Sequence, residues 1–471
     1  MALETGRSTK TWVLVLTSTA SFMVALDALV VTTALSSIAR DLDASIAELQ
    51  WTVNAYNLSF AVLLLTGAGL GDRLGRRRMF VCGIVLFAAA SVGCALARDI
   101  GWLIAARAVQ GVGAALVMPL AMGLLSAAFD RDERAKALGL FGGVTGLALI
   151  AGPVVGGAIA EGVDWRWIFW VNVPIAAVIL PLTSRRIAES FGTKAPIDSP
   201  GLILVTASAL GLVWGLMRAN SAGWMSIEVT ASLGAGLVIA AAFVWWETST
   251  DAPMVPMRLF ASNAFAAGIA SAFLFYGAMY GVLFLLPQYL QTAQGHGPLA
   301  AGLRLLPWTS TLLVFAPIGG TLVKWHGERR LVVGGLLAQA LGMAWIGAIA
   351  TPALPYNELV VPLLLAGSGV SLAMPAAQNA VMGAVVPAEI GKASGTFNML
   401  RYLGGAFGIA VLVATFAHPG DLASAKGFSD GFARAMLAAA ALSLLGALAG
   451  LALPRRALPA PLRVERSSDA A

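Results

Sequence analysis

The chain has 471 residues, of which 58% are hydrophobic and only 11% are charged, and its mean hydropathy is +0.82. This composition excludes a water-soluble globular domain, in which roughly half of the residues are apolar and about a quarter are charged. The formal net charge of +6 does not indicate a nucleic-acid partner, because the basic residues lie between the apolar runs, where they set membrane orientation.

Apolar runs long enough to cross a bilayer recur along almost the whole chain. A hydrocarbon core of about 30 Å takes roughly 20 residues of helix. The runs are apolar at odd and even positions alike, unlike the alternating strands of a membrane barrel. We therefore predict an all-α integral membrane protein with about fourteen transmembrane helices. The predicted spans are 11–33, 51–70, 79–97, 102–127, 138–160, 167–184, 200–218, 229–246, 263–286, 301–323, 331–350, 358–382, 395–417 and 432–453.

The distribution of lysine and arginine predicts that both termini face the cytoplasm. An even number of spans places the termini on the same side of the membrane. Of the 30 basic residues, 21 lie on that side, 6 on the opposite side and 3 inside spans. Because basic loops remain in the cytoplasm, we expect a multi-pass protein of the plasma (inner) membrane, surrounded by the lipid bilayer.

The first predicted span contains an acid. Within FMVALDALVVTTAL, residues 22–35, Asp27 is the one charged side chain, and ionisable residues inside a membrane are costly and usually functional. Arg107 lies in the fourth span, which runs in the opposite direction, so the two side chains can meet. We expect Asp27 to carry a proton and Arg107 to set its proton affinity. The alternative is a static ion pair that braces the two helices.

The loop after the second span has the glycine- and arginine-rich sequence AGLGDRLGRRR, residues 68–78. Asp72 is expected to accept hydrogen bonds from a neighbouring helix N-terminus while Arg76 bridges to another acid. Together with Gly75 and Arg77, these residues would then form a latch that holds one conformation. The alternative is a basic loop that only sets topology.

The fifth span contains AGPVVGG, residues 151–157. Pro153 removes a backbone hydrogen bond, and Gly152, Gly156 and Gly157 expose backbone for close packing, so we expect a kinked helix that packs tightly against its neighbour. Such a seam would stop protons from leaking through an empty transporter. General small-residue packing is the alternative interpretation.

The sequence also repeats. GVGAALVMP at 111–119 is echoed by GSGVSLAMP at 367–375, an offset of 256, and GDRLGRRRM at 71–79 is echoed more weakly by VKWHGERRL at 323–331. Parallel halves of six helices are typical of secondary transporters, with the substrate path between them. The expected division is an N-terminal six-helix bundle, two inserted helices with linkers, a C-terminal six-helix bundle and a disordered cytoplasmic tail, at 1–190, 191–260, 261–453 and 454–471.

Polar residues inside spans are candidates for the substrate path. Any of them can equally form a hydrogen bond between helices. The candidates are Asn54, Asn57, Tyr276, Tyr280, Gln378, Asn379, Asn398 and Arg401.

Taken in order, these motifs resemble the major facilitator superfamily, and specifically its fourteen-helix drug:proton antiporter branch of the EmrB/QacA type. The resemblance covers nearly the whole chain. The loop motif is similar to the superfamily signature after helix two, with Ala68 where glycine is usual. LIAARAVQGVGAA at 103–115 is similar to the helix-four signature of the superfamily, and AGPVVGG is similar to the antiporter signature of helix five.

The resemblance implies a proton-coupled antiporter that exports small amphipathic or aromatic compounds, such as drugs or antibiotics, by alternating access. Proton-coupled uptake of a metabolite is the alternative. A membrane-embedded enzyme or a receptor is a weaker alternative, because the chain has no nucleophile motif and no phosphate-binding loop. We expect no cofactor and no metal site, a proton gradient as the energy source, a neutral or monovalent small-molecule substrate, and a monomer.

Overall fold

The computed structural model describes residues 2–192, 196–386, 389–416 and 424–455; the predicted tail lies almost entirely outside them. The described residues contain no strand, and fourteen helical segments are long and apolar enough to cross a membrane. The all-α membrane fold and the fourteen spans are therefore confirmed.

The first half contains α1 (Ala2–Leu42), α2 (Ile46–Leu74), α3 (Arg76–Ala95), α4 (Ile100–Ala128), α5 (Arg131–Gly162), α6 (Trp167–Trp170) and α7 (Asn172–Arg186). The inserted helices are α8 (Ser199–Ala222) and α9 (Ile227–Ser249), followed by the short η1 (Met257–Ala261). The second half contains α10 (Asn263–Gln288), η2 (Tyr289–Ala293), α11 (Pro298–Arg304), α12 (Leu306–Thr309), α13 (Thr311–His326), α14 (Glu328–Ile349), α15 (Tyr356–Gly383), α16 (Ile390–Phe416) and α17 (Ala425–Gly450).

Two spans are interrupted, and one is longer than expected. The sixth span consists of α6 and α7, and the tenth consists of α11, α12 and α13. Pro307, in the first turn of α12, lacks the backbone N–H that a continuous helix needs. The first helix continues to Leu42 rather than ending near residue 33, so Asp27 lies about 22 Å from the end of its helix.

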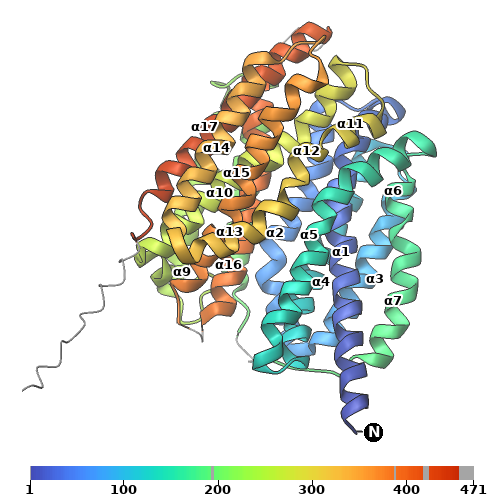
Figure 1. Cartoon of the computed structure of the whole chain (residues 1–471), viewed down its shortest axis with the longest axis vertical. Helices are drawn as coiled ribbons and strands as arrows, with labels where there is room; N and C mark the ends of the chain where they lie inside the picture. The colour runs from blue at the N-terminus through green and yellow to red at the C-terminus, as the bar shows by residue number, and fades with distance from the viewer. Residues whose placement is uncertain (1, 193–195, 387–388, 417–423, 456–471) are drawn as a thin grey trace, which may run out of the picture.

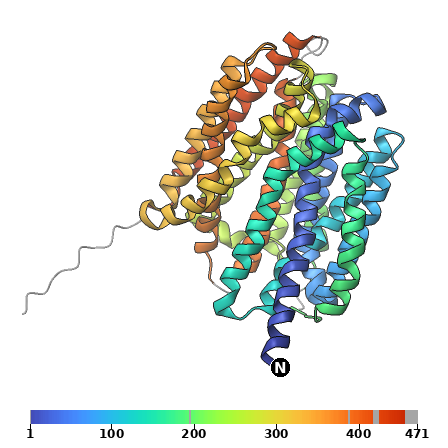
Figure 2. The same ribbon diagram turned by 45° about the vertical axis from the view of Figure 1, so that its right-hand side comes forward.

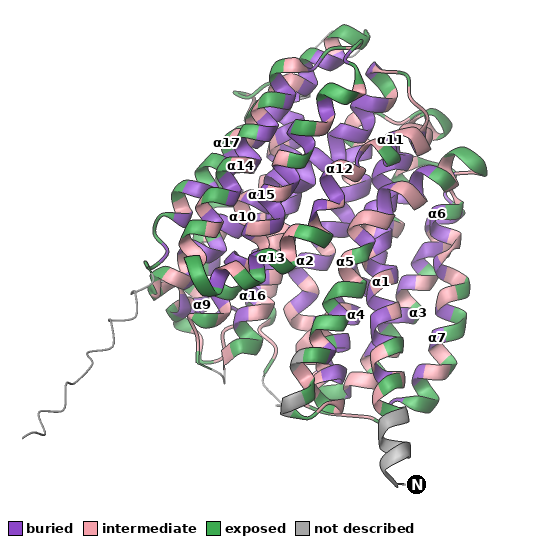
Figure 3. Cartoon of the chain, viewed as in Figure 1, coloured by how far each residue is buried: buried purple, intermediate pink, exposed green. Residues whose placement is uncertain are grey.

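The two six-helix halves lie side by side, as Figure 1 shows in blue to green and in yellow to red. The buried residues are concentrated in α1, α2, α10 and α16, whereas α7 and α9 carry many exposed ones (Figure 3). Exposed apolar residues on α9 include Leu237, Val238 and Trp245. Such surfaces are suited to contact with lipid chains, because the lipid tails are as apolar as the side chains themselves.

The inserted helices α8 and α9 form a pair that covers one side of the junction between α2 and α16. The hydroxyl of Ser208 donates to the Gly236 carbonyl and that of Ser232 to the Gly211 carbonyl, both across the α8–α9 contact. Residues of α8 then pack with residues of α2 and α16 in one apolar cluster. The cluster consists of Leu58, Val213, Met217, Ala406 and Ala410.

One face of the molecule, here called the basic face, carries the N-terminal end of α1 and the arginine-rich ends of the helices. Lys10 of α1 pairs there with Asp130, the N-cap of α5, at 2.8 Å and with Glu133 in the first turn of α5 at 2.6 Å. The hydrogen bond from Lys10 lowers the pKa of Asp130. The halves approach each other at the opposite end of α5 and diverge toward the basic face (Figures 1 and 2).

Candidate functional site

The structure brings Asp27 of α1 and Arg107 of α4 together in a buried ion pair inside the first half. Asp27 is 2% exposed and Arg107 fully buried. The other carboxylate oxygen, Oδ1, accepts hydrogen bonds from Gln110 Nε2 at 2.8 Å and from Asn172 Nδ2 at 2.9 Å. Both amides also donate to the Ser91 hydroxyl. Residues from α1, α3, α4 and α7 therefore surround a single carboxylate, and its hydrogen-bonding capacity is well occupied.

The guanidinium of Arg107 is held by aromatic and backbone groups in addition to Asp27. Its Nε donates to the Thr52 carbonyl at 3.3 Å. Its carbon lies 4.3 Å from the Tyr56 ring centre and 5.7 Å from that of Phe169, both within the range of cation–π attraction. The Tyr56 hydroxyl donates to the Val24 carbonyl on α1. However, Arg107 Nη2 is buried without a hydrogen-bond partner, so this cation retains an unused donor.

Three residues of this network were not singled out by the sequence. Gln110 is three positions after Arg107, inside the helix-four signature, so helical spacing places both on one face. Asn172 begins α7 in the interrupted sixth span, and polar residues at helix breaks in membranes often line sites. Ser91 is a lone serine in an apolar helix, and no signal in the sequence distinguishes it from a packing residue.

The glycines of α5 lie in two close helix contacts. A Cβ atom at Gly152 would come within 2.6 Å of the Leu29 Cβ, and one at Gly156 would overlap the Val30 carbonyl oxygen, so both face α1. Gly157 instead faces the second half, where a Cβ would overlap the carbonyl oxygen of Pro298 at the start of α11. The motif thus packs α5 against both α1 and α11, and the second contact joins the two halves.

This seam lies away from the basic face and is extended by hydrogen bonds between the halves. Gln291 Nε2 donates to the Thr33 carbonyl, and the Glu161 carboxylate accepts from the Leu299 backbone N–H, both at 2.9 Å. Toward the basic face, by contrast, a Cβ at Gly143 of α5 would meet nothing within 4 Å. The α5–α11 seam therefore joins the halves at the face opposite the basic one.

The loop between α2 and α3 differs from the expected latch. Asp72 pairs with Arg76, four residues later, at 2.7 Å, so Arg76 bridges to Asp72 itself rather than to a second acid. The α3 N-terminus is capped instead by Glu189, which follows α7 and accepts from the backbone N–H groups of Arg77 and Arg78 at 2.8 and 3.2 Å. Sequence reasoning did not identify Glu189, because it is more than 110 residues away along the chain.

Gly75 permits this arrangement. Its φ of 108° lies in the region that favours glycine, and a Cβ there would come within 3.0 Å of the Glu189 carboxylate. The hydrogen bonds of the loop go to the first half or to the linker before α8, including Arg76 N–H to the Ser190 carbonyl. In this conformation the loop is tied to its own half.

Arg401 of α16 lies among aromatic side chains at the junction of the halves. Its guanidinium carbon is 4.5 Å from the Tyr276 ring centre and 5.3 Å from that of Tyr402. Tyr402 contacts Tyr280 within the second half and Phe60 across on α2, with ring centres 6.2 and 4.3 Å apart. Among the described residues no carboxylate pairs with Arg401, and its Nε is buried without a partner.

The remaining substrate-path candidates are not gathered at this cluster. Asn54 faces α8, with its amide nitrogen 4.0 Å from the Met217 sulfur, and Asn398 donates to a carbonyl of its own helix. Asn379 is exposed near the end of α15 and donates to Glu328 at the start of α14, because its helix ends only four residues later. Asn57 is buried on α2, and Gln378 is exposed beside Asn379.

Two six-helix halves, a buried intramembrane ion pair and a close helix seam between the halves define a secondary membrane transporter. Residues 17–409 match the profile of the Major Facilitator Superfamily, and the chain belongs to this superfamily. Its fourteen spans fit the fourteen-helix drug:proton antiporter branch. Family membership points to a transporter rather than an enzyme, and the fold is that of a multi-pass membrane protein.

Curated relatives and solved structures agree with this assignment. The chain is 35% identical over 406 residues to the multidrug resistance protein Stp of Mycobacterium tuberculosis, covering 86% of this chain and 75% of the relative. It is 36% identical over 469 residues to the cephamycin export protein CmcT of Amycolatopsis lactamdurans, covering 95% and 96%. A POT family transporter in complex with a thioalcohol-conjugated peptide has a TM-score of 0.70 at 14% identity, covering 94% and 95%, and shows the shared fold.

Proposed function

We propose that the chain exports small amphipathic or aromatic compounds across the plasma membrane in exchange for protons, by alternating access. The observation that carries the proposal is the carboxylate of Asp27, buried in a membrane span and held by Arg107. Maintaining a buried charge pair in a bilayer is costly unless the charge is used. The names of the relatives, a multidrug resistance protein and a cephamycin export protein, support export as the direction.

Proton transfer at Asp27 would act through its ion pair. Adding a proton removes the negative charge that holds Arg107, and the unused Arg107 Nη2 donor favours a second position for the guanidinium. Because Asp27 is 2% exposed here, a proton reaches it only in a conformation that opens a water path. Binding and release of the proton are thereby coupled to the conformational cycle.

The substrate path is proposed to pass the Arg401 cluster. Tyr276, Tyr280 and Tyr402 come from the second half and Phe60 from the first, so a compound bound there contacts both halves. Aromatic rings favour flat, apolar ligands. We further propose a monomer with the basic face in the cytoplasm, following the positive-inside rule, and a proton gradient as the energy source without a cofactor.

The test uses purified protein in liposomes and a compound identified by screening expressing cells against a panel of antibiotics and dyes. Under an imposed pH gradient the wild-type protein should accumulate the compound uphill. Asp27→Asn should abolish uphill transport yet retain downhill exchange, since the amide resembles the protonated acid but releases no proton. The control is Asp41→Asn, at an exposed ion pair with Arg166, which should pump normally.

Two results would contradict the proposal. Uphill pumping by Asp27→Asn at the wild-type rate would show that another group carries the proton. Accumulation driven in the same direction as the proton flux would identify a symporter instead.

A further inference from the structure

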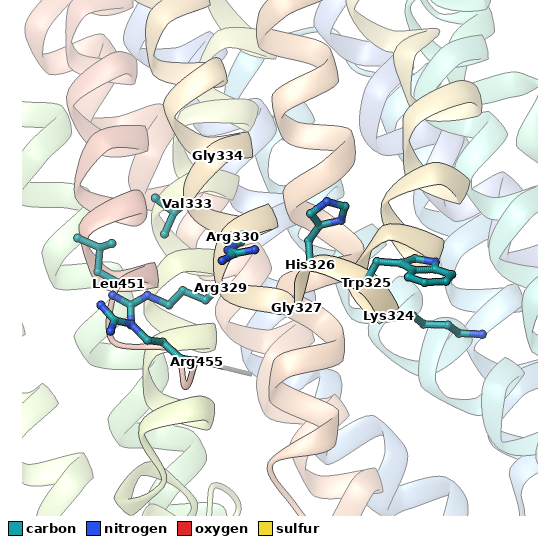
Figure 4. Close-up of a pocket in the computed structure, with 10 residues that line it drawn as sticks. All are labelled: Lys324, Trp325, His326, Gly327, Arg329, Arg330, Val333, Gly334, Leu451 and Arg455. Carbon is teal, nitrogen blue, oxygen red and sulfur yellow. The ribbon is translucent and has the colours of Figure 1, made fainter. Parts of the chain in front are cut away.

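A basic pocket of about 1020 Å³ lies on the basic face of the second half, apart from the ion pair and the aromatic cluster. Figure 4 shows its lining, from Lys324 and Trp325 at one end to Leu451 and Arg455 at the other. It is formed by the end of α13, the start of α14 and the segment after α17. The ends of three membrane-spanning helices meet there, so the pocket lies at the level of the bilayer surface.

The cations of this pocket lack counter-ions. In the described part of the chain, no ion pair or side-chain hydrogen bond involves Lys324, Arg329, Arg330 or Arg455. The nearest acid in sequence, Glu328, accepts instead from Asn379 on α15. Several cations gathered around one pocket repel one another, and an anion between them removes that repulsion.

In the first half, the arginines at the start of α3 have an acidic partner from the same chain. There, Glu189 follows the last helix of the half by three residues and lies beside Arg77 and Arg78 at the start of α3. In the second half the residue five positions after the last helix is Arg455. The segment after the last helix of the second half therefore brings a cation to the pocket at the start of α14, whereas the equivalent segment of the first half brings a carboxylate to the start of α3, and α14, whose N-cap is Gly327, has no side-chain cap.

The rim of the pocket is apolar. Trp325 is 81% exposed and Leu451 45% exposed, and Val333 of α14 also lines the pocket. Tryptophan is favoured at the boundary between headgroups and acyl chains. Basic pockets between helix ends at this level bind anionic lipid headgroups.

We propose that this pocket binds the phosphate headgroup of an anionic phospholipid. The arginines Arg329, Arg330 and Arg455 contact the phosphate, which takes the place that the Glu189 carboxylate has in the first half, and the acyl chains pass Trp325 and Leu451 into the bilayer. Arginine suits this role because its planar fork donates two parallel hydrogen bonds to phosphate oxygens. The proposal is independent of efflux and of proton coupling.

Native mass spectrometry of the purified full-length protein tests the site, with phosphatidylglycerol, phosphatidylcholine or inorganic phosphate added. Wild type should retain phosphatidylglycerol in preference to phosphatidylcholine. The triple variant Arg329→Gln, Arg330→Gln, Arg455→Gln should weaken retention by about 100-fold, taking roughly fivefold for each basic residue. The matched control removes three cations outside the pocket on the same face: Arg73→Gln, Lys136→Gln and Arg185→Gln.

A charge-reversed variant keeps the test decisive if the triple variant folds poorly. Arg455→Glu gives the second half a carboxylate after its last helix, as in the first half, and should fold normally while losing phosphatidylglycerol. Normal retention by Arg455→Glu would overturn the proposal. An equal loss of phosphatidylglycerol in the control triple variant would also overturn it. Displacement of the lipid by inorganic phosphate as effectively as by excess phosphatidylglycerol would overturn it too, because the pocket would then bind any free anion.

Discussion

Gly157 offers the sharpest test of the seam between the halves. Replacing it with valine places a Cβ atom 2.7 Å from the Pro298 carbonyl carbon and 2.8 Å from the Leu299 Cα. These are backbone atoms, so no side-chain rotation relieves the overlap. Ordinary carbon–carbon contact is about 3.5 to 4.0 Å, and α5 and α11 must therefore separate by roughly 1 Å or the halves must part.

The cost of this overlap determines the size of the effect. Overpacking a close contact costs about 1 to 3 kcal/mol. If that cost falls only on the conformation with the seam closed, the ratio of open to closed molecules rises by about 5- to 150-fold. Gly143→Val is the matched control, because it lies on the same helix and makes the same change of residue, but its Cβ meets nothing within 4 Å.

The measurement is the distance between spin labels at Val163 and Thr351, in a background without Cys82 and Cys94. Val163 directly follows α5, Thr351 closely follows α14, and both are exposed. Gly157→Val should raise the population at longer distances, and Gly143→Val should leave it unchanged. An unchanged distribution for Gly157→Val, or the same shift in both variants, would refute the assignment of this glycine to the seam.

Two further substitutions test the loop and the aromatic cluster. Glu189→Gln weakens the charge-assisted hydrogen bonds to two N–H groups at the start of α3 and should lower the thermal unfolding midpoint by about 1 to 3 °C. Glu133→Gln, at an exposed pair, should leave the midpoint unchanged, and equal midpoints for the two variants would contradict the capping role. Arg401→Ala removes the cation stacked on Tyr276 and should raise the half-saturating concentration of an exported aromatic compound by about 2- to 30-fold, measured in proteoliposomes. Asn398→Ala, whose amide bonds its own helix, is the control, and equal effects of both changes would argue against a substrate contact.

Patterns with short or regular spacing could be predicted from the sequence, and contacts between distant segments could not. The fourteen spans follow from apolar run length, and the meeting of Asp27 and Arg107 follows from two helices that run in opposite directions. Glu189 and Arg455 lie in segments after helices, where no periodicity fixes the direction of a side chain. Asn379 was expected on the substrate path, but the predicted span 358–382 and the observed α15 both end within four residues of it, so its position near the membrane surface could have been predicted from the span itself.

The geometry of α1 connects the proposed proton site to the seam. Asp27 lies two and three residues before Leu29 and Val30, the two α1 residues that contact the glycines of α5. The same helix α5 contacts Pro298 of the second half through Gly157. In the proposed cycle, a shift or rotation of α1 when Asp27 gains a proton acts directly on the helix that joins the halves, through contacts too close to absorb it. This route runs from the ion pair of Asp27 and Arg107 through α1 and α5 to α11, and it links the close-packed glycine motif to the buried acid on the adjacent helix.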